Sequence, residues 1–284
     1  MDFQWYPGHM TKAKRMMQEN MKLIDIMIEL VDARIPLSSR NPDIDQLAAN
    51  KSRLILLNKT DMADERVTAQ WEEYFKEKGF YVARTNARSG KGVKGTQAIV
   101  MDACKEKLER DRKRGIKNRP IRAMIAGIPN VGKSTFINSL VGKACTKTGN
   151  KPGVTKGKQW IRLNKGLELL DTPGILWPKF EDQQVGMRLA FIGSMNDEIL
   201  IPDELACDLI GAIKELYPKA LQERYAADPV GKPIEILEAV AESRKCYSKG
   251  EQLDLVKASG LLIDDFRSGK LGRMTLERID SDNE

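Results

Sequence analysis

One run of residues, Gly127 to Ser134, has the types and spacing needed to hold a phosphate group. Glycines occupy its first and sixth positions and a lysine and a serine follow, which is the phosphate-loop pattern. Glycines let the backbone wrap a phosphate, while N–H groups of the loop and of the following helix supply positive potential. We expect Lys133 to act catalytically by neutralising the β- and γ-phosphates, and the Ser134 hydroxyl to bind Mg²⁺. Further nucleotide contacts are expected from Asn130, Val131, Gly132 and Thr135.

A second group of residues could complete the metal and γ-phosphate site. A few dozen residues after the phosphate loop, the Asp171 carboxylate can hold Mg²⁺ and the Gly174 N–H can contact the γ-phosphate. Alone, this Asp-Thr-Pro-Gly sequence would be an ordinary turn, but its position favours a functional interpretation. Between the two motifs, Thr155 is a candidate catalytic switch residue that binds Mg²⁺ when a γ-phosphate is present. A surface loop over Gly142–Gly157 is the alternative.

Two further motifs have the chemistry to recognise guanine. Asn58, Lys59 and Asp61 follow a predicted strand. The Asp61 carboxylate can accept hydrogen bonds from N1–H and the 2-amino group of guanine, which adenine does not offer. Asn58 can donate to the other edge of the base, and the aliphatic part of Lys59 can cover the ring. Asn86 and Ala87, which end the next strand, would add backbone contacts near the guanine oxygen. These motifs predict GTP and GDP, rather than ATP, as ligands.

The elements that must position these residues alternate between short apolar strands and amphipathic helices, which is typical of a mostly parallel α/β sheet. The predicted strands are Ile26–Val31, Arg53–Leu57, Phe80–Arg84, Ile121–Ala126 and a hairpin of Gln159–Leu163 and Leu167–Leu170. The predicted helices among them are Asp64–Lys78, Val93–Arg114 and Lys133–Leu140. From Pro202 onward we expect only helices, at Glu204–Leu216, Ile234–Ser243, Glu251–Gly260 and near Leu262. The sequence thus predicts an α/β domain over residues 1–180, a boundary between Trp177 and Pro202, and a small all-α domain over residues 200–284.

Composition limits the class of protein. A chain of 284 residues suggests about two domains, and no apolar run approaches the ~20 residues that span a bilayer, so we expect no membrane partner. The first ten residues lack the pattern of a signal peptide. The four cysteines lie dozens of residues apart, which fits neither a zinc module nor a disulfide framework. We therefore expect reduced thiols and a cytoplasmic protein.

Charge is distributed unevenly along the chain. Residues 203–284 hold 12 basic and 17 acidic side chains, a net charge of −5, so the total of +7 leaves +12 for residues 1–202. The basic run Lys105–Arg114 contains interspersed acids and is consistent with a solvated helix face. Between Phe136 and Leu167, in contrast, there are seven basic residues and no acidic one. This second stretch favours a polyanionic partner.

The order of the motifs, with base recognition before phosphate binding, resembles that of the circularly permuted GTPases. Within that class the chain resembles the ribosome biogenesis GTPase A family nearly end to end. The resemblance includes Trp5–Met10, Val31–Pro36 and the helical tail. An aromatic anchor before a helix near Thr11 remains an alternative for the first stretch, and a structural ion pair of Asp32 with Arg34 for the second. The permuted order also joins the switch region after Gly174 directly to the tail.

The resemblance implies a monomeric GTPase that hydrolyses GTP with Mg²⁺. It implies binding to a late precursor of the large ribosomal subunit and its rRNA, with release on hydrolysis. A GTP-gated RNA-binding regulator, in which hydrolysis times nothing, is the alternative. The tail resembles small helical RNA-binding domains, although its net charge also suits a protein partner. The residues that could form one basic face of the tail are Arg244, Lys245, Lys249, Lys270 and Arg273.

The sequence lacks one expected catalytic group. Ras-like enzymes orient the attacking water with a glutamine directly after the Asp-x-x-Gly motif, where this chain has Ile175. An apolar side chain cannot polarise water, so we expect a low intrinsic rate and stimulation by the ribosomal particle. Two candidates could complete the site: a K⁺ ion held by Asn130, as in related GTPases, and His9, the only histidine. A structural role is the alternative for each residue.

Overall fold

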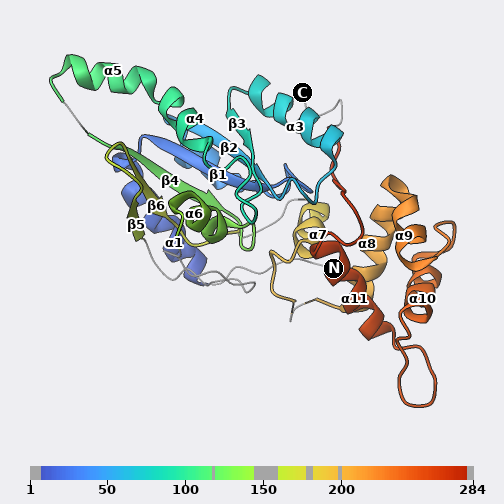
Figure 1. The fold of residues 1–284 in the computed structure, drawn as a ribbon. Helices are drawn as coiled ribbons and strands as arrows, with labels where there is room; N and C mark the ends of the chain where they lie inside the picture. The colour runs from blue at the N-terminus through green and yellow to red at the C-terminus, as the bar shows by residue number, and fades with distance from the viewer. Residues whose placement is uncertain (1–7, 117–118, 144–158, 177–181, 198–199, 280–284) are drawn as a thin grey trace.

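The protein is represented by a computed structural model that describes residues 8–116, 119–143, 159–176, 182–197 and 200–279 (Figure 1). Its centre is a six-stranded sheet of order β3-β2-β1-β4-β6-β5. The strands are β1 (Ile26–Asp32), β2 (Ser52–Asn58), β3 (Tyr81–Arg84), β4 (Ile121–Gly127), β5 (Gln159–Arg162) and β6 (Leu167–Asp171). β5 pairs antiparallel with β6, and the other neighbouring strands pair in parallel. This confirms the predicted mostly parallel sheet, and each predicted strand lies within one residue of the observed one.

Strand register brings the ends of four strands to one edge of the sheet. Asp32 at the end of β1 is level with Asn58 at the end of β2, and Leu30 is level with Gly127 of β4. Asp171, at the end of β6, is level with Ile125 of β4. Parallel α/β sheets bind ligands outside the carboxyl ends of their strands.

Helices flank the sheet, and one of them, α3, begins at a side-chain cap. The helices near the sheet are α1 (Gly8–Asn20), α2 (Asp43–Leu47), α3 (Glu65–Glu77), α4 (Thr96–Ala103), α5 (Lys105–Lys113) and α6 (Lys133–Val141), with a 3₁₀ turn at Met21–Leu23. The Asp64 side chain caps α3 by accepting hydrogen bonds from two backbone N–H groups, and Trp71 and Phe75 on its buried face pack on the sheet. None of these or the later helices of the described part of the chain could cross a membrane.

The predicted single helix Val93–Arg114 is wrong, because α4 and α5 are separate helices that meet at Cys104. α4 keeps Val100 in the core, whereas no residue of α5 is buried. The break lets the apolar part remain on the sheet while the polar helix α5 projects from it (Figure 1).

The chain is helical from Pro202 onward, as predicted, with α8 (Pro202–Leu216), α9 (Pro218–Tyr225), α10 (Pro233–Ser243) and α11 (Leu255–Arg267). A further helix that was not predicted, α7 (Gln183–Phe191), precedes them, and we include it in the tail. The expected helix end at Gly260 is wrong, because α11 continues through it. A glycine at an exposed position inside a helix lowers the stability of the helix by about 1 kcal/mol. Burial of Leu262 and Phe266 in the following turns of α11 offsets this cost.

After α11 the chain returns to the α/β part. The N–H of Leu276 donates to the Arg34 carbonyl at 2.7 Å, and the Trp71 indole N–H donates to the Glu277 carbonyl at 3.3 Å. The buried Glu277 carboxylate also accepts hydrogen bonds from the backbone N–H groups of Leu37, at 2.7 Å, and Ser38, at 2.9 Å. The last described residues therefore pack against α3 and the loop after β1, while Glu277 also pairs with Arg188 of α7 at 3.3 Å.

Candidate nucleotide-binding site

The phosphate loop joins β4 to α6 in the strand–loop–helix arrangement expected from the sequence. Gly132 has φ 103°, and a Cβ there would lie 2.6 Å from Asn58 Nδ2. Only glycine fits this position. Gly174 also lies against the loop, since a Cβ on it would lie 2.9 Å from Pro129 Cα and 3.0 Å from Lys133 Nζ. The structure thus brings the two phosphate motifs into contact.

Lys133 is buried and donates to carbonyl oxygens of its own loop, Gly127 at 3.2 Å and Ile128 at 3.4 Å. Burial lowers the pKa of Lys133 to about 8, and the Asp171 carboxylate opposes this shift. The hydrogen-bond partners of the ammonium group are therefore neutral carbonyl oxygens. A bound phosphate would stabilise the charged form of Lys133.

The surroundings of the Asp171 carboxylate fit a Mg²⁺ ligand. Both carboxylate oxygens are buried and have no hydrogen-bond partner among the described residues. Burial raises the pKa of Asp171 to about 6, although Lys133 opposes the shift. A buried carboxylate without a partner is costly unless a cation compensates it. Asp171 and Ser134 are the described residues that would hold Mg²⁺, which when bound would neutralise charge on the phosphates. The third predicted ligand, Thr155, lies outside the described residues.

Ile175 follows the Asp-Thr-Pro-Gly motif and points into the core. Its side chain is 1% exposed and its N–H donates to the Gly127 carbonyl at 3.4 Å. No polar group therefore occupies the position directly after this motif. His9 lies in the first turn of α1, and its side chain lies outside the described residues.

Asn58 joins the guanine motifs to the phosphate loop. Its Nδ2 donates to the Val131 carbonyl at 2.9 Å, and its Oδ1 accepts from the Ala87 N–H at 3.0 Å and the Thr85 hydroxyl at 3.2 Å. The side chain is 1% exposed. Asn58 thus holds three loops together, a role that the sequence did not reveal. The Ala87 N–H, expected near the guanine oxygen, is bonded to Asn58 in this structure, and the Asn86 Oδ1 accepts from Arg88 and Ser89 N–H groups, both at 3.0 Å.

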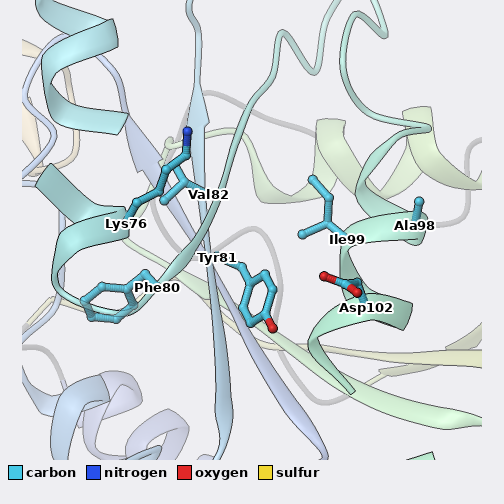
Figure 2. Close-up of a pocket in the computed structure, with 7 residues that line it drawn as sticks. All are labelled: Lys76, Phe80, Tyr81, Val82, Ala98, Ile99 and Asp102. Atoms are coloured by element: carbon cyan, nitrogen blue, oxygen red, sulfur yellow. The ribbon is translucent and has the colours of Figure 1, made fainter. Parts of the chain in front are cut away.

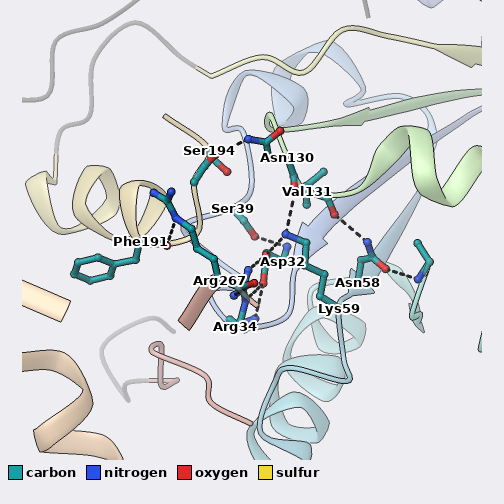
Figure 3. A network of polar contacts seen from close by, with 12 residues as sticks. Asp32, Arg34, Ser39, Asn58, Lys59, Asn130, Val131, Phe191, Ser194 and Arg267 are labelled. Carbon is teal, nitrogen blue, oxygen red and sulfur yellow. Dashed lines mark hydrogen bonds and ion pairs between the residues drawn. The ribbon is translucent and has the colours of Figure 1, made fainter. Parts of the chain in front are cut away.

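Lys59 lies in a buried polar network (Figure 3). Its Nζ donates to the Asn130 carbonyl at 2.9 Å and pairs with Asp32 Oδ2 at 2.9 Å. Arg34 binds the same carboxylate, with its Nη2 2.8 Å from Asp32 Oδ2. Burial disfavours the charged form of Asp32, but Arg34 and Lys59 outweigh it and hold the Asp32 pKa well below its usual range. The structural ion pair considered for Asp32 and Arg34 is present. Asp61, by contrast, is exposed.

Two residues after α7 also contact the phosphate loop, and sequence reasoning missed both. The Asn130 Nδ2 donates to the Gly193 carbonyl at 2.6 Å, and the Ser194 hydroxyl donates to the Pro129 carbonyl at 2.8 Å. Figure 3 shows the Asn130 and Ser194 side chains close to each other. Asn130, the candidate K⁺ ligand, therefore has a structural partner in the tail. A glycine carbonyl and a serine hydroxyl belong to no sequence motif that would predict these two contacts.

Three of the residues proposed for a basic face of the tail form ion pairs with acidic side chains. Arg244 and Lys270 both pair with Asp265, at 3.7 and 3.4 Å. Arg273 instead turns to the α/β part, where it pairs with Glu65 at 2.7 Å. Spacing along the chain could not show that Arg273 pairs with a residue outside the tail.

A surface cleft of about 490 Å³ lies between α3 and α4 beside the edge strand β3 (Figure 2). Phe80 and Tyr81 line one side and Ile99 of α4 lines the other. None of its lining residues belongs to a nucleotide motif, so we do not place the nucleotide there.

Comparisons with known proteins agree with this geometry. A family model described as 50S ribosome-binding GTPase matches residues 122–227. Ribosome biogenesis GTPase A of Bacillus cereus is 51% identical over 98% of this chain and 94% of its own length. The protein of the same name from Priestia megaterium is 48% identical over 98% of this chain and 97% of its own length. The crystal structure of GNP-bound YlqF from T. maritima matches with a TM-score of 0.66 and 29% identity, covering 94% of this chain and 98% of that one.

Proposed function

This chain belongs to the ribosome biogenesis GTPase A family, and from this premise we propose that its GTP-bound form binds a late precursor of the large ribosomal subunit and is released on hydrolysis. Family membership makes the chain a GTPase of ribosome assembly. The particle, its rRNA and the timing of release are our proposal.

One observation carries the proposal: the phosphate loop is bonded directly to the start of the helical tail. The contacts are Asn130 with Gly193 and Ser194 with Pro129. A nucleotide that moves this loop would therefore shift the helices that follow. Contacts of this kind can make particle affinity depend on the nucleotide, provided that the two nucleotide states differ in them.

We propose the guanine nucleotide roles for the residues named from the sequence. Asp61 would accept from the base, Lys133 would neutralise the phosphates, and Asp171 with Ser134 and Thr155 would hold Mg²⁺. The burial of Ile175 supports a low intrinsic rate, because the chain offers no water-orienting group at that position. The particle, aided by His9 or by K⁺ at Asn130, would complete the site.

We also propose that residues 1–180 form the GTPase domain and that residues 200–284 contact the particle. Residues 203–284 are net acidic, so residues 1–202, with their net charge of +12, would supply most of the attraction to rRNA. Binding to rRNA through many phosphates would make log affinity fall steeply with log salt concentration. A flat salt response would indicate protein contacts instead.

The proposal is tested by sedimentation of the wild-type protein with large-subunit precursors. We expect it to pellet with them in the presence of a non-hydrolysable GTP analogue and to remain in the supernatant with GDP. Mature small subunits serve as the control particle. Equal pelleting in both nucleotide states would contradict release on hydrolysis and would favour a regulator in which hydrolysis times nothing.

A further inference from the structure

The guanine-recognition loop, Asn58–Asp61, is bound by the C-terminal end of the chain. Nη2 of Arg273 donates to the Thr60 carbonyl at 3.0 Å. The N–H of the next residue, Met274, donates to the Met62 carbonyl at 2.9 Å. Asp61 therefore lies between two residues whose carbonyls both accept hydrogen bonds from the tail.

The same segment binds the residues that follow the loop. Nε of Arg273 donates to the Ala63 carbonyl at 2.9 Å, and the Asp64 N–H donates to the Thr275 hydroxyl at 3.2 Å. Within the loop, Lys59 has φ 61°, a conformation that residues other than glycine adopt at a cost. Contacts from outside the loop are thus needed to hold its shape, and the tail provides them on the side of Asp61.

We propose that Arg273 is a positioning residue for base recognition: it fixes the backbone on both sides of Asp61 so that the carboxylate can meet guanine. A carboxylate that accepts from N1–H and from the 2-amino group at once must be oriented for both bonds. The guanidinium is suited to this task because its planar fork reaches two carbonyl oxygens with charge-assisted hydrogen bonds. Glu65 compensates its charge at 2.7 Å. This inference rests on the proposed guanine contact of Asp61.

Linkage gives the contact a second consequence. If tail contacts favour the loop conformation that binds guanine, then a bound guanine nucleotide must favour the tail contacts by the same factor. The end of the chain should therefore become more protected when GDP binds, although it lies more than 200 residues away from the loop in sequence.

The test measures the affinities of GDP and of inosine diphosphate, which lacks the 2-amino group, for wild type and three variants. Arg273→Ala should weaken GDP binding about tenfold, or about 1.4 kcal/mol, and inosine diphosphate binding clearly less. The matched control Lys270→Ala removes the ion pair between the exposed Lys270 ammonium and Asp265, which contacts no nucleotide motif within the described residues, and should change neither affinity. An Arg273→Ala protein that loses affinity for both nucleotides equally, or for neither, overturns the proposal.

The third variant, Asp61→Asn, tests the guanine contact of Asp61 separately from the positioning role of Arg273. It should move the preference from guanine to xanthine diphosphate, because its amide can donate to the added xanthine oxygen. Failure of that change would refute the guanine role of Asp61, whereas failure of Arg273→Ala alone would refute only the positioning role. Hydrogen exchange on the wild type needs no variant. GDP should slow exchange of the Met274 amide and leave the Ala258 amide of α11 unaffected, and an unaffected Met274 amide would contradict the proposal.

Discussion

Two buried aspartates end parallel strands of the same sheet and should respond oppositely to the same substitution. Asp171 of β6 has no hydrogen-bond partner for either oxygen among the described residues. Asp32 of β1 has both oxygens bound by Arg34, at 2.9 and 2.8 Å, and one also by Lys59, at 2.9 Å. We predict that Asp171→Asn stabilises the nucleotide-free protein and that Asp32→Asn destabilises it.

The magnitude for Asp171 follows from its pKa. Burial raises that pKa from 3.8 to about 6, which corresponds to a cost on the order of 3 kcal/mol for keeping the carboxylate charged at pH 7. An asparagine amide in the same place is neutral but also lacks partners, so we expect a gain of about 1 to 2 kcal/mol. Asp32→Asn leaves Arg34 and Lys59 buried without their counter-charge, at a cost of about 3 to 5 kcal/mol.

The two effects also differ in their pH dependence. The folded protein binds a proton at Asp171 more tightly than the unfolded chain does, so wild-type stability is gained as pH falls below about 6. The advantage of Asp171→Asn should therefore shrink between pH 7 and pH 5. The Asp32 pKa is depressed in the folded protein, so the stability that Asp32 contributes is fully present at pH values above the ordinary aspartate pKa. The loss of stability in Asp32→Asn should therefore persist at pH 5.

The assay is urea unfolding of wild type and both variants in EDTA without nucleotide, at pH 7 and pH 5. The free energies of unfolding are compared among proteins whose m-values are equal. Adding Mg²⁺ and GTP should then stabilise the wild type more than Asp171→Asn. If Asp171→Asn is less stable than wild type at pH 7 in EDTA, the carboxylate has a structural partner and our assignment of it to Mg²⁺ is wrong.

Three further predictions concern other residues of the site. Asn58→Ala leaves the Val131 carbonyl and the Ala87 N–H buried without their partner, so urea unfolding should show a loss of about 2 kcal/mol or more, and a loss below about 0.5 kcal/mol would contradict the bridging role. His9→Ala should lower particle-stimulated GTP turnover about 100-fold while GTP affinity is unchanged, and full stimulated turnover would exclude the water-orienting role. Exchange of K⁺ for Na⁺ should lower turnover if Asn130 holds the ion, and equal rates in the two salts would contradict the K⁺ role of this residue.

The parts of the fold that depend on local patterns were predictable. Buried parallel strands such as β1 and β4 are mostly apolar, and the phosphate loop places glycine where no side chain fits. The helix boundary at Gly260 was predicted wrongly, because tertiary packing and not the local residue determines where α11 ends. Gly260 is exposed, and the helix continues through it.

The contacts between distant segments were not predictable from one sequence. Arg273 was assigned to a basic face because its charge is visible in the sequence, whereas its hydrogen-bond acceptors at Thr60 and Ala63 are backbone carbonyls that any residue would offer. The Asn130–Gly193 bond is hidden for the same reason. The local chemistry of the nucleotide motifs could be inferred, but not how the tail supports it.

We propose that this GTPase has an incomplete catalytic site that the large-subunit particle completes. GTP turnover measured alone, with small subunits and with large-subunit particles tests it most directly. We predict slow turnover alone, no change with small subunits and strong stimulation by large-subunit particles. Equal stimulation by both kinds of subunit, or fast turnover by the protein alone, would contradict the claim.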